Sequence, residues 1–101
     1  MAEEKCPACA RVTERGEDER RRLQNRLSRI EGQIRGIRGM VGRDAYCNDI
    51  LIQSAAVNAA INAFNRDLIA HHIKGCVVRD IQNGSEEVID ELLDTLKKLM
   101  K

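Results

Sequence analysis

The sequence of 101 residues contains no tryptophan and only one proline, one phenylalanine and one tyrosine. Charged residues make up 33% of the chain, and alanine, isoleucine, leucine, arginine and glutamate are abundant. This composition is typical of all-helical or coiled-coil-like proteins. A chain of this length has room for one domain with a small core, so we expect it to oligomerise.

The sequence also lacks an apolar run long enough to span a membrane, and its polar start, MAEEKC, has no pattern of a signal peptide. We therefore expect a cytoplasmic protein. Four cysteines in a reducing compartment indicate metal or redox chemistry before structural disulfides.

Acidic residues are nearly absent between positions 20 and 43, where eight arginines accompany one acid, Glu31. The net charge of the whole chain is only +1, so the positive charge is concentrated rather than general. Residues 86–101 show the opposite bias, with five acids and three lysines. This asymmetry predicts one element that faces a polyanion and a separate acidic element.

Three helices are predicted after an N-terminal arm. The arm spans residues 1–16 and carries Cys6 and Cys9 in the stretch CPAC; residues 17–101 form a single all-helical domain. We place the helices at about 17–41, about 45–82 and 85–101, with Asp44 and Ser85 as N-caps of the second and third.

Apolar residues in the first helix recur in steps of four and three, which is a heptad seam. The second helix, at 38 residues, cannot fold back to bury its own apolar stripe. We therefore expect two chains to pair antiparallel into a four-helix bundle. The seam consists of Leu23, Leu27, Ile30, Ile34, Ile37 and Val41.

Three residues of the metal-binding type fall on the second helix. His72 and Cys76 are four positions apart and so share one helix face, while Cys47 lies twenty-five residues before His72. At about 1.5 Å per residue, Cys47 and His72 of one chain are about 37 Å apart and cannot share an ion. Two antiparallel chains can bring Cys47 of one beside His72 and Cys76 of the other.

The donor set of two thiolates and one imidazole is soft and three-coordinate, which favours Cu(I). Zinc normally takes a fourth ligand, and no certain one is visible. His71 projects about 100° away from His72 and is interpreted as a solvated or interfacial histidine. A cysteine on a helix is also commonly a small buried apolar residue, so spacing alone leaves the metal site open.

Arg22, Arg26 and Arg29 follow i, i+4, i+7 spacing and form one stripe on the first helix. Guanidinium groups in such a stripe suit contacts with DNA phosphates. On composition alone, an ordinary solvated charged face is the preferred interpretation of the stripe. Weaker candidates for the same surface are Arg35, Arg38, Arg43, Lys74 and Arg79.

The stretch NRLSRIEGQIRGIRGMV, followed by YCNDILIQ and HHIKGCV, resembles the CsoR/RcnR family of bacterial metal- and thiol-sensing repressors. The resemblance covers about residues 20–97. It implies an all-α protein that forms a dimer and then a tetramer, and that binds operator DNA without a helix-turn-helix. It also implies a regulator rather than an enzyme.

Within that family, copper-sensing members carry a cysteine, a histidine and a second cysteine at the spacing of Cys47, His72 and Cys76. The resemblance therefore implies a repressor that releases DNA when Cu(I) binds. It also implies a supporting tyrosine beside the first cysteine, matched by Tyr46, and a glutamate on the last helix, best matched by Glu91. Arg26 and Arg29 match basic positions that the family uses for DNA.

Several alternatives remain open at this point. Nickel-sensing relatives use an additional N-terminal histidine, and the corresponding residue here is Arg15. A persulfide or thiol sensor would not need His72, and a copper-storage protein would not need DNA. Cys6 and Cys9 are possible accessory thiols for metal or redox chemistry.

Overall fold

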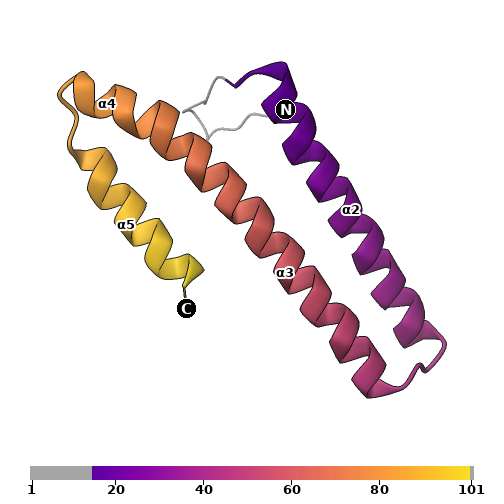
Figure 1. The fold of residues 1–101 in the computed structure, drawn as a ribbon. Coiled ribbons are helices and arrows are strands. Elements are labelled where there is room, and N and C mark those ends of the chain that lie inside the picture. Colours follow the sequence, from indigo (N-terminus) through magenta and orange to yellow (C-terminus); the bar gives the residue numbers. More distant parts are fainter. Residues whose placement is uncertain (1–14, 101) are drawn as a thin grey trace, which may run out of the picture.

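The computed structural model describes residues 15–100, and no strand occurs in that range. Helix α2 (Glu17–Gly42) packs antiparallel against α3 (Cys47–His72). A π-helical turn, η1 (Ile73–Val77), connects α3 to α4 (Val78–Gln82), and α5 (Glu87–Leu99) folds back on the side of α3 and α4 away from α2 (Figure 1). Cys6 and Cys9, in the predicted arm, lie outside the described residues.

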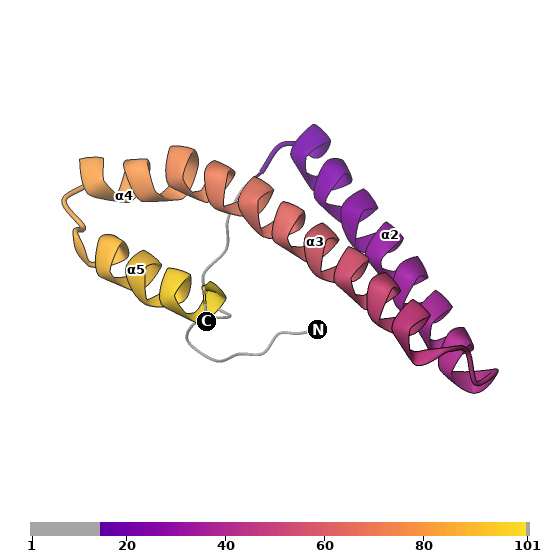
Figure 2. The same ribbon diagram turned by 60° about the horizontal axis from the view of Figure 1, so that its bottom comes forward.

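The predicted all-α fold with one long central helix is confirmed. The helical backbone continues from Cys47 to Gln82, because the residues joining α3, η1 and α4 all keep right-handed helical torsion angles. The sequence did not predict the π-helical turn within it. Figure 2 shows the central helix curving along its length, with α5 beside α4.

The heptad seam of α2 divides into two rows. Leu23 and Ile30 are each only 6% exposed and pack toward α3, whose Val57 is 8% exposed. The alternate row, Leu27, Ile34 and Val41, stays between 43% and 58% exposed. One chain therefore uses half of its seam for its own core and leaves the other half uncovered.

The helices α2 and α4 end with the same hydrogen-bonded turn. After α2, the backbone N–H of Asp44 donates to the Val41 carbonyl and that of Ala45 to the Met40 carbonyl. After α4, Gly84 and Ser85 donate in the same way to Ile81 and Asp80. These two hydrogen bonds, together with a left-handed residue after the C-cap, provide donors for the last carbonyl groups of the helix.

Two predicted N-caps are therefore wrong. Asp44 adopts a left-handed conformation, with φ of 57°, as part of the turn that ends α2. The residue before α3 is Tyr46, and the residue before α5 is Glu86 rather than Ser85. Both expected caps are instead residues of the preceding helix's closing turn.

Gly84 is the left-handed residue after α4, with φ of 90°. Because a side chain strains this conformation, Gly84→Ala is expected to lower the free energy of unfolding by about 1–2 kcal/mol. Gly84→Asn should cost less, since asparagine tolerates left-handed torsion angles. Urea denaturation of wild type, Gly84→Asn and Gly84→Ala should give free energies of unfolding that decrease in this order. Equal stability of the alanine variant and wild type would contradict the prediction.

None of the helices between residues 15 and 100 has the length and apolar character needed to cross a bilayer.

Candidate metal centre and nucleic-acid interface

Cys47 is the first residue of α3 and its side chain is exposed. Tyr46, directly before it, is 73% exposed, and its carbonyl accepts hydrogen bonds from the Asp49 and Ile50 amides. These bonds fix the first turn of α3. The thiol therefore stands on a well-formed helix start that is open to another molecule.

His72 and Cys76 lie at the other end of the central helix. His72 ends α3 and Cys76, buried at 9% exposure, sits within the π-helical turn. Both line a groove of about 860 Å³ between the central helix and α5, and Glu91 of α5 lines the same groove. The structure thus brings together the predicted histidine, second cysteine and supporting glutamate. Turns of π-helix occur frequently at functional sites.

The three predicted ligands do not meet within one chain. Cys47 and His72 stand at opposite ends of α3, about 37 Å apart by the helical rise. Among residues 15–100 of a single chain, no group of three or more histidine, cysteine, aspartate or glutamate side chains is placed to hold a metal. A complete site with these three residues would need a second chain.

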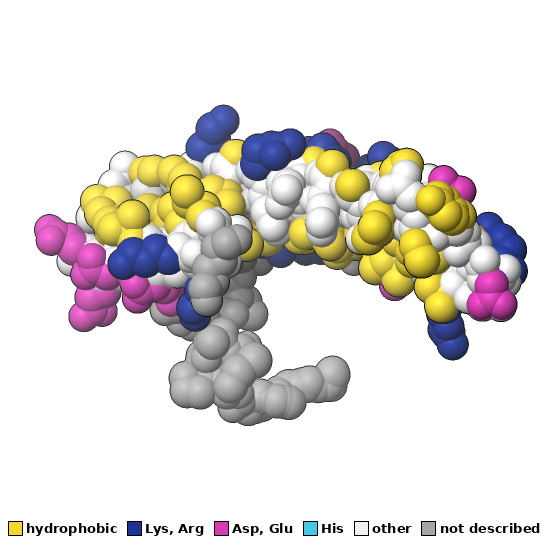
Figure 3. All heavy atoms as spheres, turned by 90° about the horizontal axis from the view of Figure 1, so that it is seen from below, with side chains coloured by type: hydrophobic (Ala, Val, Ile, Leu, Met, Phe, Trp, Pro, Cys, Tyr) yellow, Lys and Arg dark blue, Asp and Glu magenta, His cyan; other side chains and the backbone are white. Residues whose placement is uncertain are grey.

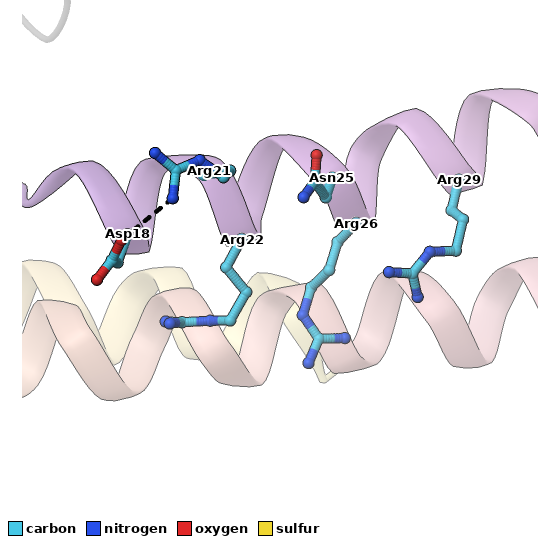
Figure 4. A pocket seen from close by; sticks show the side chains of 6 residues that line it. All are labelled: Asp18, Arg21, Arg22, Asn25, Arg26 and Arg29. Atoms are coloured by element: carbon cyan, nitrogen blue, oxygen red, sulfur yellow. Dashed lines mark hydrogen bonds and ion pairs between the residues drawn. The ribbon is translucent and has the colours of Figure 1, made fainter.

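The arginine stripe lies along the edge where α2 meets α3. Figure 4 shows Arg22, Arg26 and Arg29 projecting from α2 to the same side, toward the neighbouring helix. Together with Asp18, Arg21 and Asn25 they line a shallow groove of about 380 Å³. The predicted common face of the three arginines is confirmed as a geometrical arrangement.

The weaker candidates for the basic surface are distributed over the molecule. Lys74 and Arg79 line the groove that contains His72 and Cys76, on the central helix. Arg35 and Arg38 lie farther along α2, and Arg43 is its C-cap. The densest cluster of guanidinium groups is therefore the stripe in the first half of α2.

Asp67 of α3 pairs with the first two arginines of the stripe. Arg22 donates through Nε to Asp67 Oδ2 at 2.8 Å and through Nη2 to Oδ1 at 3.0 Å. The Nε of Arg26 lies 3.4 Å from the same Oδ2. Asp67 is therefore held by a two-pronged contact from one arginine and a single contact from the next.

His71 completes this cluster. Its Nδ1 lies 3.0 Å from the Asp67 carbonyl oxygen, and its Nε2 is 3.2 Å from Arg22 Nη2. The side chain is 41% exposed at the edge between α2 and α3. This agrees with its interpretation as an interfacial histidine, although His71 also lines the groove that contains His72.

Hydrogen bonding from Arg22 lowers the pKa of the Asp67 carboxyl below its usual range, with further support from the charges of Arg22 and Arg26. The same pair raises the pKa of Arg22. Because the folded pKa of Asp67 lies below its unfolded value of about 3.9, the pair stabilises the fold fully above that pH. The stabilisation is lost as the pH falls through the folded pKa.

We therefore expect the melting temperature of wild type to exceed that of Asp67→Asn at neutral pH. The difference should shrink as the pH falls below about 4, because the wild-type carboxylate is then protonated. Melting curves followed by circular dichroism between neutral and acidic pH measure it. A difference that stays constant over this range would show that the carboxylate charge contributes nothing.

Sequence reasoning missed Asp67, although a signal was present. Residues equally far from the turn between two antiparallel helices lie side by side. Arg22 precedes Asp44 by twenty-two residues, and Asp67 follows Ala45 by the same number. Counting outward from the predicted turn would have paired them.

Comparison with known proteins identifies the chain's relatives. The family model "Metal-sensitive transcriptional repressor" matches residues 19–98. The copper-sensing transcriptional repressor CsoR of Bacillus subtilis is 48% identical over 84 residues, which cover 82% of this chain and 83% of that protein.

Two solved structures are also similar. The copper-sensing repressor CsoR with Cu(I) from Geobacillus thermodenitrificans has a TM-score of 0.84 and 38% identity, covering 89% of this chain and 95% of that one. The nickel-responsive regulator InrS has a TM-score of 0.67 and 35% identity, covering 86% of this chain and 96% of that one. Sequence and fold agree, and this chain belongs to the family of metal-sensitive transcriptional repressors.

Proposed function

We propose that this protein is a Cu(I)-responsive transcriptional repressor of the cytoplasm. In the metal-free form it binds operator DNA, and Cu(I) binding to Cys47 of one subunit and to His72 and Cys76 of its partner lowers its affinity for DNA. One observation carries the proposal: His72 and Cys76 share a groove, whereas Cys47 stands at the far end of the same helix. In a second chain that runs antiparallel to the first, Cys47 would lie at the end where the first chain has His72 and Cys76.

The donor set fits Cu(I) by its chemistry. Two thiolates and an imidazole provide soft ligands, and Cu(I) accepts three of them without a fourth. The relatives named as copper sensors, including the Cu(I)-containing CsoR structure, support the same choice. Glu91 lines the same groove as His72, and its proposed role is to orient the imidazole by accepting from its second nitrogen. Such supporting partners tune metal sites.

Uncovered apolar side chains support an assembly of more than one chain. Besides the outer seam row of α2, Leu51 and Ile52 in the first turns of α3 are 65% and 56% exposed. In Figure 3, hydrophobic side chains gather over the α4–α5 end and over the far end of the α2–α3 hairpin. Such patches on a small chain are typical of protein interfaces. An antiparallel dimer, paired into a tetramer, would cover them.

Arg22, Arg26 and Arg29 provide the face proposed for DNA. They lie on one helix, project to one side and carry three positive charges, with the carboxylates of Asp67 and Asp18 nearby. Phosphate contacts by such groups give affinity that falls with salt concentration. By linkage, DNA and Cu(I) would weaken each other's binding by the same factor.

A nickel-responsive repressor is the second candidate, because the nickel regulator InrS shares the fold. Anaerobic titration separates the two. Cu(I) bound to thiolates and imidazole gives no visible d–d absorption, whereas square-planar Ni(II) is coloured. A coloured Ni(II) complex that releases DNA, with no response to Cu(I), would favour the nickel sensor.

The decisive experiment is a DNA-binding titration with and without Cu(I), using a duplex from the promoter of the gene that encodes this protein. Wild type should bind the metal-free duplex and lose about 5- to 150-fold in affinity with Cu(I), the usual range of allosteric coupling. Cys47→Ala should bind the duplex equally well in both conditions. Unchanged affinity of wild type with Cu(I) would refute copper sensing, and absence of any binding would refute the repressor.

A further inference from the structure

The Asp67 carboxylate occupies the arginines of the proposed DNA face in the way a phosphate would. Arg22 meets it with two nearly parallel N–H···O bonds of 2.8 and 3.0 Å, and Arg26 approaches the same Oδ2 at 3.4 Å. This two-pronged geometry is the one by which arginine recognises both carboxylates and phosphates. Arg29, the third member of the stripe, has no ion pair with Asp67.

We infer that Asp67 is a positioning residue that competes with DNA phosphates for Arg22 and Arg26, and so limits the protein's affinity for DNA. The inference rests on the proposed function, because it concerns the same basic face. It divides the three arginines into two kinds. Arg29 is available to phosphate at once, whereas Arg22 must first release its carboxylate.

The burial of the pair supports this division. The Asp67 side chain is 14% exposed, while those of Arg22 and Arg26 are 42% and 36% exposed. The carboxylate thus lies beneath the guanidinium groups rather than beyond them. DNA can reach the arginines from outside, but its phosphates meet the negative charge of Asp67 directly behind them. An aspartate is ionised at neutral pH in any case, and the hydrogen bond from Arg22 lowers the pKa of Asp67 further.

Replacing Asp67 with asparagine keeps the shape of the side chain and removes its charge. Arg22 then loses its ion pair, keeps its contact with His71, and can pair with a phosphate. Each added phosphate contact steepens the plot of log affinity against log salt by about 0.9 and makes the decrease in affinity between 50 and 200 mM salt about 3.5-fold larger. Asp67→Asn should therefore bind DNA more tightly at low salt and show a steeper slope by about 0.9 or more.

The control for this charge change is Asp94→Asn. Asp94 is exposed on α5, on the side of the central helix away from α2, and it carries the same charge as Asp67. A general effect of net charge would appear equally in both variants. A specific effect on the stripe would appear only in Asp67→Asn.

A second comparison substitutes the arginines themselves, and its first half needs no change at Asp67. In the wild-type background, Arg22→Gln should weaken DNA binding less than Arg29→Gln, because Arg22 is already occupied by Asp67. In the Asp67→Asn background, Arg22→Gln should cost about 3-fold or more in affinity at moderate salt, since the freed arginine then contacts phosphate.

The experiment measures binding to the fluorescent promoter duplex over a range of salt concentrations, with the full chain and its variants in metal-free buffer. A steeper slope for Asp67→Asn than for Asp94→Asn, with the stated order of the arginine variants, supports the inference. Equal slopes, or weaker binding by Asp67→Asn, would overturn it. Failure of Arg29→Gln to change binding would instead refute the proposed DNA face, so the two failures are distinguishable.

Discussion

His72→Ala is expected to abolish Cu(I)-dependent release of DNA, while His71→Ala leaves it in place. The two histidines are adjacent and chemically identical, but only His71 is held by Asp67 and Arg22. Both histidines line the groove with Cys76 and Glu91, but His71 also contacts Asp67 and Arg22 at the α2–α3 edge. His72 is four residues before Cys76 and shares its helix face, so we expect His72 rather than His71 to supply the imidazole.

The measurement is the ratio of DNA affinities without and with Cu(I). Wild type and His71→Ala should both give a ratio of about 5 to 150, and His72→Ala a ratio near one. Because the ratio is taken within each variant, a small effect of His71→Ala on DNA affinity itself cancels. A ratio near one in both variants would show that copper-dependent release needs both histidines, contrary to the proposed site.

Arg29→Gln is expected to weaken DNA binding strongly, and Arg20→Gln to leave it nearly unchanged. Arg29 belongs to the stripe that faces α3, as Figure 4 shows. Arg20 is nine positions away, which is about 180° around the helix, and it pairs with Glu17. The two substitutions remove the same charge from opposite faces of α2.

Because Arg29→Gln removes one phosphate-binding charge from each subunit, it should lower the salt slope by about 0.9 and the affinity by about 3-fold at moderate salt for every subunit on the duplex. In an assembly where two subunits touch the duplex, the effects multiply to about tenfold. Anisotropy of the labelled promoter duplex measures both quantities. Equal effects of Arg29→Gln and Arg20→Gln would mean that the net charge, and not this face, drives binding.

The sequence predicted the helices well because their patterns are strong. The heptad seam set α2 to within one residue at each end, and the absence of proline and glycine between Cys47 and Lys74 predicted an unbroken central helix. Asp44 and Ser85 were misassigned because both residue types favour N-caps. Here their backbone N–H groups instead close the preceding helices.

The site was predicted only in part. The spacing of His72 and Cys76 correctly placed them beside one groove, because four residues return to nearly the same side of either an α- or a π-helical turn. The π-helical turn itself left no pattern that periodicity could detect. The pairing of Arg22 with Asp67 required the register between two helices, which a single helix period does not contain.

The central claim is that the metal ligands come from two chains, and a complementation experiment tests it most directly. Cys47→Ala and Cys76→Ala proteins are each expected to lack a complete site. When they are unfolded together and refolded as a mixture, each mixed dimer unites the Cys47 of one chain with the His72 and Cys76 of the other. We predict that the mixture regains tight Cu(I) binding at one site per mixed dimer, measured by anaerobic competition with a chromogenic chelator. A mixture that binds no more Cu(I) than the separate variants would contradict the shared site.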